Sequence, residues 1–170
     1  MDIERRTSLE LRATGRRLEG YAALFDQEAR IGDFVEVIRK GAFGSSLTGR
    51  DILALLDHDP GKLLARTKSG TLRLAEDTRG LQFEIQVPPT QHGNDVLALA
   101  ERGDLGGMSF GFVVPQGGER WRGDRRELLE VQLHEISVVS SWPAYDNTVV
   151  VARAKMPSRL AAALRFMETI

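Results

Sequence analysis

Residues 106–112 have the sequence GGMSFGF, in which a single serine stands among glycines and large apolar residues. Successive side chains of a β-strand point to opposite faces, so Ser109 lies on one face and the methionine and both phenylalanines on the other. Glycine lets the backbone approach a substrate closely. A small hydroxyl on a strand braced in this way is both fixed and reachable, as a nucleophile must be. An ordinary packed serine in a glycine-rich strand is the alternative interpretation.

Length and composition limit the classes of protein to consider. The chain has 170 residues, a formal net charge of -1 and no cysteine. This length suits one domain with its own core, and the balanced charge indicates neither a nucleic-acid partner nor a membrane surface. The arginine pairs at 5–6 and 125–126 are expected at solvated strand ends. The absence of cysteine excludes disulfides, thiolate metal sites and cysteine catalysis. With no signal peptide and no apolar run near the roughly 18 residues that span a bilayer, we expect a soluble, cytoplasmic protein.

Short apolar or alternating segments, separated by Gly, Asp and Asn, predict a chain made mostly of strands. The expected strands are 18–25, 34–38, 52–58, 63–68, 71–76, 81–87, 109–114, 128–139 and 149–152. The expected helices are 40–47, 94–102, which Gly103 ends, and 158–168. The strands 63–68 and 71–76 are expected to pair as a hairpin, and 116–126 to be an exposed hairpin tip. The pattern predicts a mainly β domain with helices (α+β), a small β-barrel or sandwich with helices at its edges.

The chain has three histidines, of which His58 is the first candidate for chemistry. It ends the apolar strand 52–58 in phase with the buried side of that strand, and an aspartate flanks it on each side. A solvated histidine in an acidic turn is the alternative. His92 precedes a helix, where capping or solvent exposure is the simpler interpretation. Three consecutive residues on a strand cannot all face one ion, so 57–59 predicts no metal site, and no glycine loop has a phosphate-binding pattern. We expect neither a metal nor a cofactor.

The last long strand changes phase at His134-Glu135. Before this point the inward phase runs through Leu133 to Glu135, and after it alternate residues from Ile136 are apolar. Either the strand bulges here, or an acid lies on a face that should belong to the core. A buried carboxylate requires a partner. That partner is an arginine in a structural ion pair, or a histidine that the acid orients to activate Ser109.

Five motifs, in order, resemble those of the tailed-phage prohead maturation proteases. They are 20–25 (GYAALF), 39–43 (RKGAF), 55–59 (LLDHD), 107–112 (GMSFGF) and 135–139 (EISVV) followed by 143–145 (PAY). The motifs cover about residues 18–152. The resemblance implies a serine endopeptidase with a small β-barrel surrounded by helices, the fold of the herpesvirus assembly proteases. The whole chain, 1–170, is then a single protease domain with a C-terminal helix at about 158–168.

The resemblance also assigns roles to residues. By motif position Ser109 is the nucleophile and His58 the general base. Glu135 is chosen as the third member, because it matches the acid of the closing motif and falls on the inward phase. His134 is the fallback, since related viral enzymes use a second histidine there. The family layout suggests the turn 141–144 for the oxyanion donors.

The resemblance further implies partners and a location. Such enzymes act inside the immature phage head in the host cytoplasm. There they cleave the scaffolding segment of the major capsid protein, the scaffold and themselves. A homodimer is a further expectation, because the herpesvirus enzymes need dimerisation for activity. A non-enzymatic β-barrel module that binds scaffold or capsid is the alternative from another class. A small esterase is disfavoured, because no helix follows the Gly-x-Ser-x-Gly spacing around Ser109.

Overall fold

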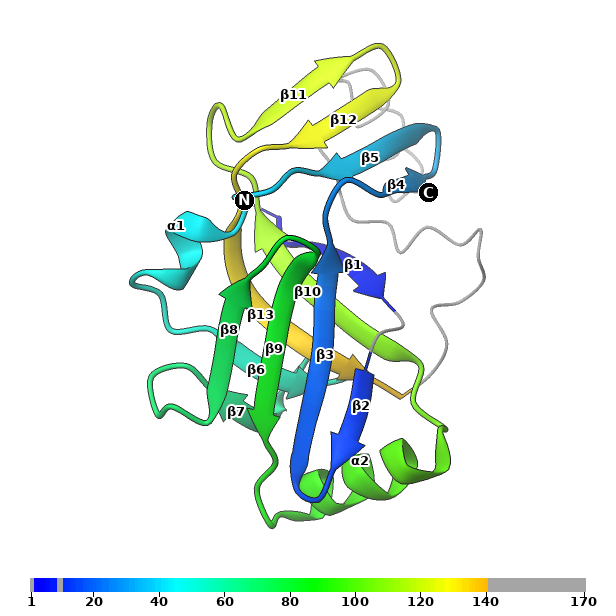
Figure 1. Ribbon diagram of the computed structural model, residues 1–170, viewed down its shortest axis with the longest axis vertical. Helices are drawn as coiled ribbons and strands as arrows, with labels where there is room; N and C mark the ends of the chain where they lie inside the picture. The colour runs from blue at the N-terminus through cyan, green and yellow to red at the C-terminus, as the bar shows by residue number, and fades with distance from the viewer. Residues whose placement is uncertain (1, 9–10, 141–170) are drawn as a thin grey trace, which may run out of the picture.

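The computed structural model describes residues 2–8 and 11–140. Within these ranges the chain forms thirteen strands and two helices (Figure 1). The coarse expectation of a mainly β domain with few helices is therefore confirmed. The strand expected at 149–152, the helix at 158–168 and the turn 141–144 lie outside the described residues.

The described strands form three sheets. The first sheet has the order β1-β10-β13-β6-β7, with β1 (Glu4–Ser8), β10 (Gly107–Val113), β13 (Gln132–Val139), β6 (Leu53–Leu56) and β7 (Asp59–Arg66). The second has the order β2-β3-β9-β8, with β2 (Leu11–Thr14), β3 (Arg17–Leu24), β9 (Gly80–Gln86) and β8 (Leu72–Glu76). The third has the order β11-β12-β5-β4, with β11 (Glu119–Arg122), β12 (Arg125–Leu128), β5 (Phe34–Ile38) and β4 (Glu28–Ile31).

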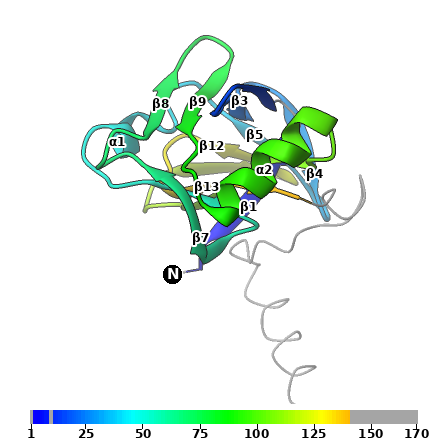
Figure 2. The same ribbon diagram turned by 90° about the horizontal axis from the view of Figure 1, so that it is seen from below.

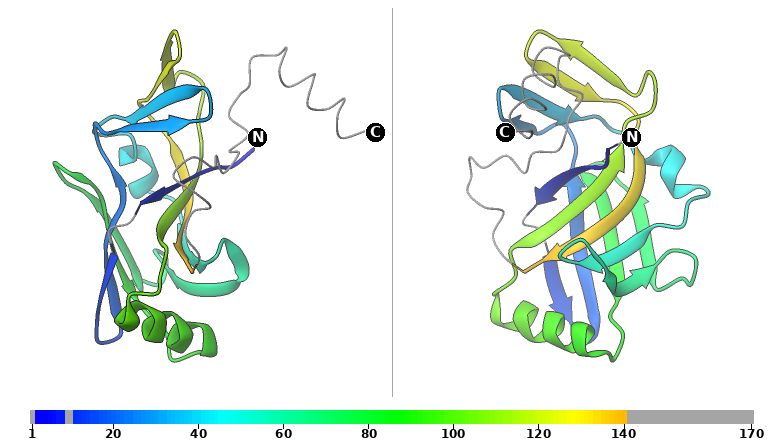
Figure 3. Two further views of the ribbon diagram at one scale, coloured as in Figure 1. Left: turned by 90° about the vertical axis from the view of Figure 1, so that its right-hand side faces the viewer. Right: turned by 180° about the vertical axis from the view of Figure 1, so that it is seen from behind.

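The first two sheets enclose the core. In Figure 1 the strands of the second sheet stand in front of the first and cross its strands. Apolar residues of both sheets belong to one buried cluster, with Phe83 and Ile85 from β9 and Phe110 and Ile136 from β10 and β13. Figure 3 (right) shows β1, β10 and β13 side by side from behind. One face of the first sheet lies in this core, so the side chains that could carry chemistry are those of its other face.

The two helices close the ends of the layered sheets. The helix α2 (Gln91–Arg102) lies across one end and contacts β2 and β7 (Figure 2). Thr90 caps its start by accepting a hydrogen bond from the Gly93 amide at 3.2 Å. Gly103 ends it with φ of 75°, as the sequence predicted. The short helix α1 (Gly44–Leu47) occupies part of the predicted segment 40–47.

Two predictions about strand connections are wrong. The strands β7 and β8 do not pair as a hairpin, because β7 pairs with β6 and β8 pairs with β9 in a different sheet. The strand predicted at 128–139 is not continuous, since Leu128 ends β12 in the third sheet and β13 in the first sheet begins only at Gln132. The alternation of apolar and polar residues identifies a strand, but the sheet that the strand joins depends on partner strands elsewhere in the sequence.

A buried cluster of charged side chains connects β1 to the third sheet. Arg6 donates from Nε to Glu36 Oε1 at 2.6 Å. Arg126, 1% exposed, donates from Nη1 to Glu4 Oε2 at 2.5 Å and from Nε to Glu119 Oε2 at 2.6 Å. Burial disfavours the charged form of Arg126, but the hydrogen bond and charge of Glu4 outweigh it and raise the pKa of the guanidinium. The expectation of solvated arginines is therefore wrong for Arg6 and Arg126.

Replacing Arg126 tests how much this cluster stabilises the fold. Arg126→Gln removes one of the two cations that Glu4 and Glu36 share and leaves only Arg6 to hold both buried carboxylates, so we expect a loss of roughly 3–5 kcal/mol in the free energy of unfolding. Denaturant unfolding measures it. Arg102→Gln is the matched control, because the Arg102 side chain is 76% exposed in its pair with Asp104. Equal losses in the two variants would contradict the prediction.

Candidate active site

Glu135 reaches the site through a bulge in β13. Gly111 pairs with Glu135 and Phe112 with Leu133, so His134 is the extra residue between two register positions. This confirms the first of the two alternatives that the sequence left open. The bulge lets Leu133 point into the core and turns Glu135 to the opposite face. The expectation that Glu135 continues the inward phase is therefore wrong, because the extra residue resets the alternation.

Ser109 lies on the same face of the sheet as Glu135. In β10 it pairs with Ser137 on one side and with Thr7 of β1 on the other. Its neighbours Met108 and Phe110 point into the core, as predicted. Ser109 is 1% exposed, and no side-chain hydrogen bond joins it to another described residue. The structure thus fixes the strand and the face of this serine, with its hydroxyl uncommitted to a described partner.

His58 lies in a two-residue turn between β6 and β7. Leu56 pairs with Asp59, and the residues between them, Asp57 and His58, have φ of 53° and 58°. This is the left-handed geometry of a type I′ hairpin turn, which favours Asn-Gly. Strain of this kind concentrates at functional sites. The prediction that His58 continues the buried phase of strand 52–58 is wrong, because the turn moves its side chain to the other face.

The turn is anchored to the end of β13. The Asp57 amide donates to the Val138 carbonyl at 2.9 Å. The Asp57 carboxylate accepts from the Ser140 amide at 2.8 Å and from its hydroxyl at 2.8 and 2.9 Å. These bonds use both oxygens of Asp57, so this carboxylate holds the turn in place and makes no bond to His58.

His58 and Glu135 are brought together by this turn and the bulge. His58 Nδ1 lies 2.6 Å from Glu135 Oε1. A carboxylate accepts and does not donate, so the proton of the neutral ring is on Nδ1 and Nε2 carries a free lone pair. No described residue forms a hydrogen bond with Nε2. This is the tautomer that a general base requires.

The surroundings of Glu135 keep its carboxylate ionised. Burial alone would raise its pKa, but the hydrogen bonds from His58 and Ser137 and the charge of Arg5 outweigh burial and hold the pKa below its ordinary value. Ser137 Oγ donates to Oε2 at 2.5 Å, and Arg5 Nε lies 3.4 Å from Oε1. Both kinds of partner that the sequence proposed, an arginine and a histidine, are therefore present.

The other two histidines have different surroundings. Nε2 of His134 lies 3.4 Å from Nη2 of Arg50. Burial and the charge of Arg50 lower the pKa of His134. The bond to His58 is made by Glu135, so the geometry favours Glu135 over its neighbour. His92 lies in the first turn of α2 rather than before the helix, because α2 begins at Gln91, earlier than the predicted start at residue 94.

Sequence reasoning did not identify Ser137 or Arg5 as part of the site. Ser137 is two residues after Glu135, so strand alternation alone places both on one face. Arg5 had no such signal, because the pairing of β1 with β10 is not apparent from the sequence.

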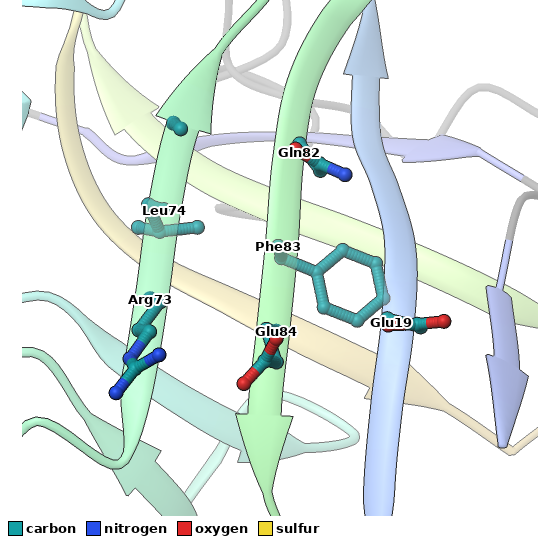
Figure 4. A pocket seen from close by; sticks show the side chains of 7 residues that line it. Glu19, Arg73, Leu74, Gln82, Phe83 and Glu84 are labelled. Carbon is teal, nitrogen blue, oxygen red and sulfur yellow. The ribbon is translucent and has the colours of Figure 1, made fainter. Parts of the chain in front are cut away.

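Other candidate features lie away from this site. Among residues 2–8 and 11–140, no group of three potential metal ligands gathers. In the same ranges no helix is long and apolar enough to cross a membrane. A shallow depression lies on the second sheet (Figure 4). Its lining residues are Glu19, Arg73, Leu74, Ala75, Gln82, Phe83 and Glu84. It contains none of the candidate site residues.

Comparisons with known proteins identify a family and a similar fold. A family model described as caudovirus prohead serine protease matches residues 2–160. The fold is similar to that of the bacteriophage T4 capsid assembly protease, with a TM-score of 0.53 and 12% sequence identity. That match covers 82% of this chain and 96% of the T4 protein. The comparison with curated proteins returned no match.

Proposed function

The chain belongs to the caudovirus prohead serine protease family, and from this premise we propose that Ser109, His58 and Glu135 are its catalytic triad. The resemblance drawn from the motifs is thereby confirmed at the level of the family. The observation that carries the proposal is the 2.6 Å contact between His58 Nδ1 and Glu135 Oε1, on the sheet face that holds Ser109. An ordinary packed serine strand does not require a histidine with a fixed tautomer nearby.

The proposed reaction is acyl transfer followed by hydrolysis. The Ser109 oxygen attacks the peptide carbonyl while His58 Nε2 accepts the hydroxyl proton. His58 then gives this proton to the leaving amine, and the C–N bond breaks to leave an ester on Ser109. Water attacks the ester by the same proton route and restores the serine. Glu135 stabilises the imidazolium that forms in each half, so all proton transfers use side chains of the chain and we infer no cofactor.

Access to Ser109 sets a condition on the activity. Ser109 is 1% exposed and has no described hydrogen bond to His58, so the contact between the nucleophile and the general base still has to form for the reaction. Catalytic hydrogen bonds often tighten only in the complex with substrate. We infer that substrate binding completes the contact between Ser109 and His58.

The substrates follow from the family. We infer that the enzyme cleaves the scaffolding segment of the major capsid protein, the scaffold and itself, inside the immature phage head. Support comes from the prohead protease family and from the fold shared with a capsid assembly protease. We further infer one protease domain over 1–170, a barrel of the herpesvirus protease type, and a homodimer. The single core between the sheets supports the first, whereas the barrel and the dimer rest on the family relation alone.

Labelling with a fluorophosphonate probe and peptide mapping tests the triad. We expect modification at Ser109 in the wild type and none in His58→Ala, because the probe reacts with activated serines. Ser45→Ala is the control, since Ser45 is an exposed serine of α1. Absence of labelling together with absence of cleavage of a capsid precursor would contradict the proposal. The alternative of a non-enzymatic capsid-binding module has no observation in its favour.

A further inference from the structure

The carboxylate of Glu135 is held at both of its oxygens. Oε1 faces His58 at 2.6 Å, and Oε2 accepts the Ser137 hydroxyl at 2.5 Å. Ser137 has no exposed surface, whereas the side chain of Arg5, the third partner, is 39% exposed. A hydrogen bond between two buried groups is not weakened by exchange with water. Ser137 is therefore the strongest fixed support for the orientation of Glu135 apart from His58 itself.

Gly111 supplies the space in which this carboxylate lies. It is the cross-strand partner of Glu135 in the pairing of β10 with β13. A Cβ atom built on Gly111 would lie 2.7 Å from Glu135 Oε1 and 3.1 Å from its Cγ. The distance to Oε1 is shorter than real Cβ atoms show, and Ile3 Cγ2 would lie 3.0 Å away on another side, so a side chain here requires the Glu135 carboxylate to move. The absence of a side chain at Gly111 thus leaves room for the carboxylate of Glu135.

We propose that Ser137 and Gly111 are positioning residues, which fix the Glu135 carboxylate in the one orientation that holds His58. The inference rests on the proposed function. Each residue acts from its own strand: Ser137 on β13 holds Oε2, and Gly111 on β10 leaves room for Oε1. Neither touches the reacting atoms. The hydroxyl of Ser137 donates to an acid and is fully buried, so it does not compete with Ser109 as the nucleophile.

The His58 Nδ1–H proton reports this positioning directly. Its downfield resonance in the NMR spectrum exists only while the bond to Glu135 protects the proton, and it can be recorded in the inactive Ser109→Ala background. We expect Ser137→Ala to shift or abolish the signal. In the active background we expect kcat to fall roughly 10- to 100-fold with KM little changed, the range for one hydrogen bond to a charged group.

A matched buried serine separates positioning from general loss of stability. Ser46 is also buried, and its hydroxyl donates to the Val131 carbonyl and accepts from the Leu133 amide, both at 2.8 Å. Ser46→Ala therefore removes buried hydrogen bonds without touching Glu135, and we expect it to keep the His58 signal and kcat. If Ser137→Ala behaved like Ser46→Ala in both measurements, the positioning role would be wrong.

A second variant keeps the inference testable if Ser137→Ala does not fold. Gly111→Ala should displace Glu135 and remove the same signal, whereas Gly49→Ala, at a glycine with no atom near its Cβ position, should not. An unchanged signal in Gly111→Ala would overturn the inference. Failure of the triad itself appears differently, because it would leave wild-type Ser109 unlabelled by the fluorophosphonate probe whatever the His58 signal shows.

Discussion

Ser109→Ala is expected to lower kcat/KM for cleavage of a capsid precursor by roughly 10⁴- to 10⁶-fold, because a triad without its nucleophile retains only substrate binding and transition-state contacts. The folded state should be almost unaffected. The Ser109 hydroxyl has no described hydrogen-bond partner to lose, and alanine fills nearly the same volume. A time course of precursor cleavage on a gel measures the activity, and denaturant unfolding measures the stability.

Two further serines decide how this result is interpreted. Ser45→Ala, on the exposed side of α1, should cleave at the wild-type rate. Ser137→Ala should lose activity only partly, since its hydroxyl supports Glu135 and attacks nothing. Retention of activity in Ser109→Ala with complete loss in Ser137→Ala would move the nucleophile to β13 and contradict the assignment.

The strand that carries Ser109 could be predicted because its two faces differ sharply. Met108 and Phe110 belong to the core, so alternation alone places Ser109 on the other face. The shift of the apolar phase by one residue at His134-Glu135 limited the interpretation to two alternatives, of which the structure shows the bulge. Both features depend on the alternation of apolar and polar residues along one strand, which can be read from the sequence.

Features that depend on distant partners could not be predicted. Arg126 resembles a solvated strand-end residue in the sequence, and it is buried only because carboxylates from β1, β5 and β11 converge on it. The direction of His58 depends on a left-handed turn that neither Asp57 nor His58 demands by residue type. The contact between His58 and Glu135 joins residues 77 positions apart, so it exists only once β6 lies beside β13.

Glu135→Gln is expected to lower kcat by roughly 10²- to 10⁴-fold, less than the loss in Ser109→Ala. Glutamine has the same shape, but its amide can donate a hydrogen bond to His58 Nδ1. The ring proton then lies on Nε2, and a protonated Nε2 cannot accept the proton of the Ser109 hydroxyl. Cleavage kinetics at neutral pH measure the loss. His134→Ala is the matched control, because this neighbour lies beside Arg50 and should matter little. Equal losses in Glu135→Gln and His134→Ala would make the choice of third residue wrong.

The effect of Glu135→Gln on the free energy of unfolding should depend on pH. The folded state holds the pKa of Glu135 below its ordinary value, because the bonds from His58 and Ser137 outweigh burial. A carboxyl with a depressed folded pKa stabilises the protein above its unfolded pKa of about 4.3, and this contribution disappears as pH falls through the folded pKa. The difference in unfolding free energy between wild type and Glu135→Gln should therefore be full at neutral pH and shrink below about pH 4. Urea unfolding of both proteins across this range measures it. A difference that stays constant or grows as the pH falls would mean that the folded state does not hold Glu135 as a carboxylate. His58 would then lack the negative charge that stabilises its imidazolium in the proposed mechanism.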